Sequence, residues 1–341
     1  MPGRTTARTE SVRRAAIILL LGCASLATSA WDGADRFDPP AWLERMERSI
    51  STLDYIGTFV LIQGGEVQTM QVVHRVRDGE ERERLLSLDG TAREVIRDAT
   101  EVRVYLPDRG TVVVDQRALD NPLRGSLPRF QERLLEVYRF EMQGDDRVAG
   151  RATRILAILP KDELRYGQRL WLDVETGLPL RTETLSPAGV VLSQLMFTGI
   201  QVGMGIPDSA LEPTVRVEAL RSVRASSAPP PLRGVLAEES PWSVADPPAG
   251  FVLEARKVQA MAEVGGVVEH LVFSDGIASI SVYIEHADLG TDHIQGTSQL
   301  GEVHAYAKVI QGHLVTVVGE VPERTVRAMA DAVRYRGRHP R

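Results

Sequence analysis

The sequence is poor in cysteine: its 341 residues include one, Cys23, close to the N-terminus. A single thiol cannot close an intramolecular disulfide, which excludes the small disulfide-stapled folds common among secreted proteins. A cysteine nucleophile is excluded as well if the N-terminal segment is removed. The fold therefore depends on a hydrophobic core, for which the chain is long enough.

An excess of positive charge is also missing. The formal net charge is −6 and the pI is about 5.7, whereas a nucleic-acid-binding protein presents a basic face. We therefore expect no nucleic-acid partner. After residue 30, no apolar run approaches the roughly 20 residues that a membrane-spanning helix requires.

The common catalytic motifs are absent too. The sequence contains no G-x-S-x-G elbow, no H-E-x-x-H, no P-loop and no dinucleotide-binding fingerprint. The paired carboxylates Asp145-Asp146 and Asp162-Glu163 lie in polar turns, where solvation explains them. An enzyme is the least favoured class, and we expect no catalytic residues and no cofactor.

Histidines gather in the C-terminal part, and only His74 precedes residue 247. Two explanations stay open for the polar segment that holds His286, Asp288, Asp292 and His293. One is a metal or pH-sensing site, because imidazole and carboxylate groups are suitable ligands. The other is an ordinary polar loop. The spacing fits no compact metal motif, so the loop is favoured and no metal is expected.

The N-terminus has the pattern of a signal peptide. Four arginines precede an apolar run over residues 15–26, and the small residues 27–30 follow it. We expect residues 1–30 to be removed on export. A minority alternative is lipidation at Cys23, since Leu20-Leu21-Gly22-Cys23 partly resembles a lipobox.

Residues 36–217 are predicted to form a first domain dominated by strands. Asp89-Gly90 is a preferred two-residue hairpin turn, because both positions need positive φ. Over 101–106, Val102, Val104 and Leu106 alternate with Glu101, Arg103 and Tyr105, as in a half-buried strand.

Two helices are predicted in this domain. Asp38 can cap one that begins with Pro39-Pro40, and residues 127–138 have an amphipathic helical pattern. In the strand over 66–77, both faces carry apolar side chains, so neither can lie in water. We expect about ten strands in a curved antiparallel sheet or half-open barrel, with helices covering it.

A Pro/Ser/Ala-rich linker is predicted over 218–246, and a second, smaller domain over 247–337. Trp242 is unusual in a free linker and is expected to dock on one domain. Asp275-Gly276 marks another hairpin, and a final helix is expected after Pro322. The small domain should be a four- or five-stranded antiparallel sheet packed on one helix, which makes the fold class α+β.

Several segments together resemble the periplasmic regulators of sigma-E activity known as the RseB/MucB family. Each is weak alone, but they occur in the family's order over almost the whole chain beyond the N-terminal segment. They are Tyr55–Val60 (YIGTFV), Glu83–Val95, Tyr105–Asp108 (YLPD), Arg147–Arg151, Arg165–Gly167, Leu170–Asp173 (LWLD), Phe273–Ser279 (FSDGIAS) and Val315–Pro322 (VTVVGEVP).

The resemblance implies a regulator without enzymatic activity. Its large domain would be similar to the LolA/LolB lipoprotein carriers, with an apolar cavity for a lipid or the acyl chains of lipopolysaccharide. Its small domain would help hold the periplasmic domain of a membrane-bound anti-sigma factor of the RseA/MucA type and shield it from proteolysis. Lipidic envelope-stress signals would release it. Family members also self-associate, and the location would be the periplasm.

Candidate residues follow from these expectations, although core packing is at least as good an explanation for each apolar one. The cavity candidates are the large apolar residues of the strands, namely Phe59, Leu61, Met70, Tyr105, Leu106, Trp171, Leu180 and Met196. The candidates for partner binding surround the second hairpin, namely Phe273, Ser274, Asp275, Gly276 and Tyr283. The alternative function is a periplasmic lipid or lipoprotein carrier, although a carrier would need only the large domain.

Overall fold

A computed structural model describes residues 38–115, 127–215, 220–224, 240–261, 266–287 and 295–336. Within these ranges the chain is mostly β, with few helices. None of the described helices is long and apolar enough to cross a membrane. The predicted signal peptide, most of the predicted linker, and Asp288, Asp292 and His293 lie outside the described residues.

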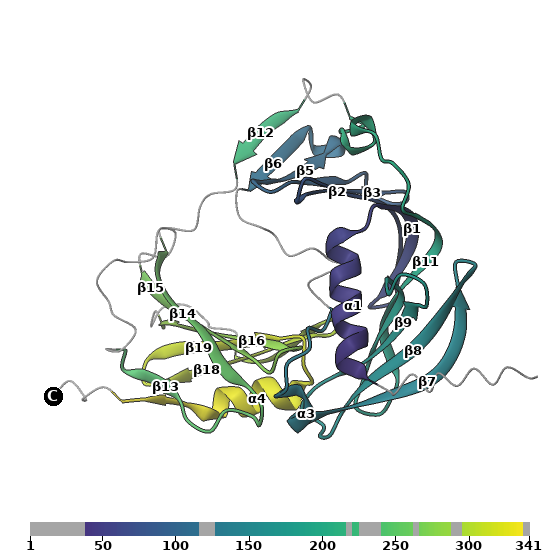
Figure 1. Cartoon of the computed structure of the whole chain (residues 1–341). Coiled ribbons are helices and arrows are strands. Elements are labelled where there is room, and N and C mark those ends of the chain that lie inside the picture. Colours follow the sequence, from purple (N-terminus) through teal and green to yellow (C-terminus); the bar gives the residue numbers. More distant parts are fainter. Residues whose placement is uncertain are drawn as a thin grey trace, which may run out of the picture. The chain divides into compact units, whose positions relative to one another are not determined.

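Helix α1 (Pro39–Thr52) begins where its capping chemistry predicts. Asp38 is the N-cap, and its Oδ1 accepts a hydrogen bond from the Ala41 amide at 3.4 Å. Proline fits the first turn because the amides there have no partner within the helix. The buried side of α1 presents Leu43, Met46 and Ile50 to the neighbouring sheet, and Figure 1 shows the helix lying across one face of that sheet.

The large sheet has twelve strands in the order β12-β6-β5-β4-β3-β2-β1-β11-β10-β9-β8-β7. Together with α1 and the short elements η1 (Pro107–Arg109), α3 (Leu134–Val137) and η2 (Asp208–Leu211), it forms the large-sheet region, residues 38–224. Its strands are β1 (Tyr55–Gln63), β2 (Glu66–Arg77), β3 (Glu80–Ser87), β4 (Glu94–Arg97), β5 (Val102–Leu106), β6 (Thr111–Asp115), β7 (Tyr138–Val148), β8 (Arg151–Pro160), β9 (Gly167–Asp173), β10 (Pro179–Leu185), β11 (Val191–Val202) and β12 (Arg221–Arg224).

Two expectations about this region need correction, and the half-open barrel is not confirmed, since β12 and β7 are the two edges of the described sheet. The sheet is not purely antiparallel, because β12 pairs with β6 in parallel. The helix expected over 127–138 is limited to α3, and Phe130 instead packs edge-on against Phe140 of β7, with ring centroids 6.1 Å apart. Tertiary packing outweighs the local helical pattern there.

The small sheet has six antiparallel strands in the order β14-β15-β16-β19-β18-β17, more than the four or five expected. With α4 (Glu323–Ala332) and the two-stranded pair of β13 (Trp242–Val244) and β20 (Val333–Tyr335), it forms the small-sheet region, residues 240–336. Its strands are β14 (Val252–Met261), β15 (Gly266–Ser274), β16 (Ser279–His286), β17 (Gly296–Leu300), β18 (Val303–Ile310) and β19 (His313–Gly319).

Each region has its own hydrophobic core. In the large-sheet region, the buried side of α1 packs on the sheet residues Phe59, Leu172 and Leu180. In the small-sheet region, α4 contributes Val326 and Met329 to a separate cluster, which Trp242 also joins. Trp242 is 5% exposed and therefore docks as expected. Two separate cores allow each region to keep its fold if the contacts between them change.

Candidate ligand and partner sites

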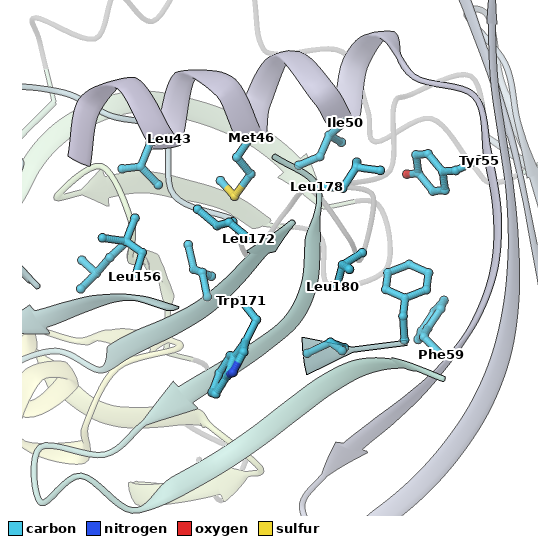
Figure 2. Packing of buried hydrophobic residues seen from close by; sticks show 14 of the residues in the cluster. Leu43, Met46, Ile50, Tyr55, Phe59, Leu156, Trp171, Leu172, Leu178 and Leu180 are labelled. Carbon is cyan, nitrogen blue, oxygen red and sulfur yellow. The ribbon is translucent and has the colours of Figure 1, made fainter. Parts of the chain in front are cut away.

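The core under α1 consists of buried apolar side chains. Figure 2 shows Leu43, Met46 and Ile50 of α1 above Leu178 and Leu172, with Leu180 and Phe59 farther along the same side of the sheet. Burying such side chains stabilises each by about 1.5–3 kcal/mol relative to exposure. This part of the face serves as a packed core.

Beyond α1 the same face carries a continuous apolar row. Direct cross-strand pairing links Val72 to Leu85, Leu85 to Val95, Val95 to Val104 and Val104 to Val113, and β12 adds Val223 opposite Val113. Residues that pair directly point to the same face of a sheet. We call these six residues the apolar row: Val72, Leu85, Val95, Val104, Val113 and Val223.

Exposure increases along the apolar row. Val72 and Leu85 are 0% and 2% exposed, the next three members are half-buried, and Val223 is 36% exposed. The row therefore leads from the packed core toward solvent across neighbouring strands about 4.8 Å apart. An aliphatic chain laid along it would cover apolar surface without breaking any backbone hydrogen bond.

The register divides the eight cavity candidates between the two faces of the sheet. Those on the α1 face are Phe59, Leu61, Met70, Leu106 and Leu180. Those on the opposite face are Tyr105, Trp171 and Met196. None of the six residues of the apolar row is among these candidates, because the choice by side-chain size favoured larger residues over valines.

The opposite face is occupied by other contacts. Tyr105 is buried with Ile96 and Val112 under residues 215 and 220. Trp171 has the guanidinium of Arg181 4.2 Å from its ring centroid, and its Nε1 donates to Asp146 at 2.9 Å. The alternation at 101–106 already placed Tyr105 and Leu106 on opposite faces, so that pattern could have separated them.

The partner-binding candidates fall into two environments. Phe273 is in the core of the small-sheet region, and Tyr283 is 36% exposed and stacked on His270 with ring centroids 4.3 Å apart. The turn between β15 and β16 instead contacts the large-sheet region. A Cβ on Gly276 would lie 3.1 Å from Leu134 Cδ2, so only glycine fits there without displacement.

Asp275 in this turn is the acceptor of a buried ion pair. Its Oδ2 accepts from Arg165 Nη1 at 2.8 Å and from the Tyr138 hydroxyl at 2.9 Å. Its Oδ1 accepts the amides of Ile277 and Ala278 at 2.9 and 2.8 Å. Both charged side chains are 0% exposed. Burial, followed by the Asp275 carboxylate, raises the pKa of Tyr138, which keeps its hydroxyl protonated as a donor.

A second group of polar contacts links the regions at the turn between β17 and β18. Gln63 Nε2 donates to Glu302 Oε2 at 2.7 Å, and the Tyr166 hydroxyl lies 3.2 Å from His304 Nδ1. Burial, with Glu302 and Glu320 nearby, raises the pKa of Tyr166 to about 12. Partial burial and the charge of Glu302 also raise the pKa of Glu320, although its side chain keeps more than a third of its surface exposed.

A metal centre finds no support among the residues that the structure describes. They contain no group of three or more His, Cys, Asp or Glu side chains arranged to hold an ion. His286 and His313 stack with ring centroids 5.2 Å apart, and each directs Nδ1 at a backbone carbonyl.

Comparison with known proteins covers both regions. Residues 38–215 match the MucB/RseB N-terminal domain, and residues 236–334 match the MucB/RseB C-terminal domain. The sigma factor AlgU regulatory protein MucB of Pseudomonas aeruginosa is 32% identical over 330 residues, covering 95% of this chain and 98% of that protein. The sigma-E factor regulatory protein RseB of Salmonella typhimurium is 28% identical over 321 residues, covering 93% and 96%.

Two solved structures of MucB are also similar to this chain. A crystal structure of MucB in complex with MucA(peri) is similar with a TM-score of 0.69 and 30% identity, over 88% of this chain and all of that one. A crystal structure of MucB is similar with a TM-score of 0.56 and 28% identity, over 86% of this chain and 97% of that one.

Proposed function

Because this chain belongs to the MucB/RseB family, we propose that it is a periplasmic negative regulator of the sigma-E envelope-stress response. It binds the periplasmic domain of a membrane-bound anti-sigma factor and protects it from regulated proteolysis. The similarity to MucB in complex with MucA(peri) supports the partner. The function is one of binding, not catalysis.

A lipid is the proposed signal, and the apolar row is the observation that carries this proposal. The row combines a buried end with an exposed end, as an acyl chain entering from solvent would require. Leu106 lies on the same face beside Val104 and can extend the surface. In this proposal the large sheet curves like half of a LolA/LolB-type barrel, with Phe59, Leu61, Met70 and Leu180 forming its packed base.

Partner binding is assigned to the small-sheet region. Exposed Tyr283 of β16 stacks on half-buried His270 of β15, on the sheet face opposite to the core residues Val282 and Ile284. Aromatic side chains are enriched at protein interfaces because they bury a large area with few rotatable bonds. Of the remaining candidates, Phe273 packs in the core of this region, whereas Asp275 and Gly276 contact the large-sheet region.

We propose the predicted domain boundaries and processing, with β12 and β13 as the parts of the predicted linker that pair with strands of the two regions. We assign residues 1–30 to a signal peptide, 36–217 to the lipid-binding domain, 218–246 to a linker and 247–337 to the partner-binding domain. The mature protein is periplasmic and can self-associate. Release follows if the lipid binds more tightly to the partner-free form than to the complex, which is the condition for linkage between two ligands.

A binding assay tests this function. The mature protein is mixed with a fluorescent peptide covering the periplasmic segment of the anti-sigma factor, and anisotropy is measured with and without purified lipopolysaccharide. Binding without lipopolysaccharide and its loss on addition are expected. Equal binding in both conditions would remove the lipid signal from the proposal, and no binding in either would remove the partner.

Two valine variants locate the lipid. Val104→Glu places a charge in the half-buried part of the apolar row, where desolvating it opposes insertion of an acyl chain. We expect this variant to bind the partner normally and to need at least about tenfold more lipopolysaccharide for release, since about 1.4 kcal/mol corresponds to a factor of ten. Val67→Glu is the matched control, because Val67 is 61% exposed on the other face of the sheet. An equal response of both variants would place the lipid elsewhere.

A further inference from the structure

The contact between the two regions, which we call the joint, is centred on Arg165. This residue lies in the connection between β8 and β9. Its guanidinium donates to three separate acceptors, namely Asp162 Oδ1 at 3.1 Å, Asp275 Oδ2 at 2.8 Å and the Ala249 carbonyl. Asp162 belongs to the same region as Arg165, whereas Ala249 and Asp275 belong to the small-sheet region. One side chain therefore connects three chain segments.

Aromatic rings and a glycine complete the enclosure of this guanidinium. The ring centroid of Tyr138 lies 5.5 Å from the Arg165 Cζ atom and that of Phe251 lies 5.1 Å from it. Gly250 has a φ of +83°, and a Cβ there would lie 3.1 Å from Arg165 Nη1. The socket is shaped around the planar guanidinium, which a lysine ammonium could not fill in the same way.

The net stability of such a contact is smaller than its geometry suggests. Removing two charges from water costs free energy that the mutual attraction of a buried pair only offsets, so the pair fixes an arrangement without adding much stability. The surrounding links between the regions are also largely polar: Gln63 to Glu302, Tyr166 to His304, and the Thr325 hydroxyl to the Leu164 carbonyl at 2.6 Å. Among apolar residues, Ile277 reaches from the small-sheet region to the large core.

We propose that the buried pair of Arg165 with Asp275 is a releasable contact that holds the two regions in one arrangement. Breaking this pair couples lipid binding on the large-sheet region to partner release by the small-sheet region. This regulation rests on the proposed function. Arg165 is thus a positioning residue that contacts neither ligand. Its release leaves both regions folded, because each has its own core.

Thiol labelling measures opening of the joint without any partner. Replacing Cys23 by serine leaves a chain with no cysteine, and Ile277→Cys then places one thiol in the joint. Arg165→Met should raise its rate of maleimide labelling at least about tenfold, because Asp275 is left buried without its counter-charge. Arg139→Met is the control, since Arg139 is an exposed arginine that pairs with Glu141. Purified lipopolysaccharide should raise the rate with Arg165 intact.

An engineered disulfide tests whether the two regions must separate before the anti-sigma segment is released. A Cβ on Gly64 would lie 4.0 Å from Gly301 Cα, so Gly64→Cys with Gly301→Cys, in the Cys23→Ser background, can form a disulfide across the joint. The oxidised form should keep the anti-sigma segment when lipopolysaccharide is added, and its reduced form should lose it. Loss from both forms alike would overturn the coupling and leave the proposed function intact. Failure of the reduced form and of the parent chain to bind the segment would contradict the proposed function instead. An unchanged labelling rate in Arg165→Met would directly refute the proposed role of the Arg165–Asp275 pair.

Discussion

Gly250→Ala is the substitution whose cost can be worked out most directly from the structure. Gly250 has a φ of +83°, and an added Cβ would meet Val137 Cγ1 at 2.7 Å. Positive φ costs a residue with a Cβ about 1–2 kcal/mol. Overpacking of this kind adds about 1–3 kcal/mol. The two effects together predict a loss of about 2–5 kcal/mol in the free energy of unfolding.

Gly189→Ala is the matched control. Its φ is +79°, close to that of Gly250, and a Cβ there would meet nothing within 4 Å. It should therefore cost only the strain of about 1–2 kcal/mol. Urea unfolding followed by far-UV circular dichroism gives both values, with each transition fitted separately if the regions unfold apart.

The difference between the two variants reports the contacts with Val137 and Arg165. If Gly250→Ala costs no more than Gly189→Ala, then α3 moves aside freely and the packing around Arg165 is loose. That result would refute the close fit of the joint, whatever the absolute values. A larger loss in Gly250→Ala, without a change in the fold by circular dichroism, is the expected outcome.

Two further predictions concern packing and pH. Leu180→Ala should lower the free energy of unfolding by about 2–5 kcal/mol, because Leu180 is fully buried beneath α1; Val190→Ala, 61% exposed, should change it by less than about 0.5 kcal/mol in the same urea assay. Glu320 has a pKa raised above 4.5 by partial burial and by Glu302, so its contribution is present below pH 4.5 and is lost as the pH rises through the raised value. Glu320→Gln stays neutral and should remove this part of the decline in thermal stability; an unchanged pH profile would contradict the assigned cause.

Features set by neighbouring residues were predictable. Asp38 and Pro39 fix the start of α1, because a capping carboxylate and a proline satisfy the first turn locally. The chain turns at Asp89-Gly90 and at Asp275-Gly276, but only the two glycines have positive φ, +62° and +100°. The predicted two-residue turn at Asp89-Gly90 is wrong, because β3 ends at Ser87 and β4 begins only at Glu94. The two extra strands of the small sheet, β14 and β17, were missed, although each pairs with the next strand in the sequence, β15 and β18. β17 is polar and mostly exposed, so it lacks the apolar alternation that marks a half-buried strand.

The face of each strand could not be assigned with the same ease. Both faces of β2 are apolar, so alternation alone does not show which side meets α1. The segment after β11 covers the opposite face, where Ile206 and Leu211 pack on Val73. Residues such as Trp171 were therefore grouped with the α1 face by size, while cross-strand register separates them.

The sequence by itself determined the capped helix, the hairpin turns, a sheet that needs cover on both faces, and membership of a regulator family. These follow from local backbone preferences, side-chain periodicity and recognisable segments. The tertiary structure alone decided the apolar row and the joint around Arg165. The row depends on the register of five strand pairings that no single strand encodes. Arg165 and Asp275 are 110 residues apart. Burial of such a pair depends on how two folded surfaces meet, which local sequence does not specify.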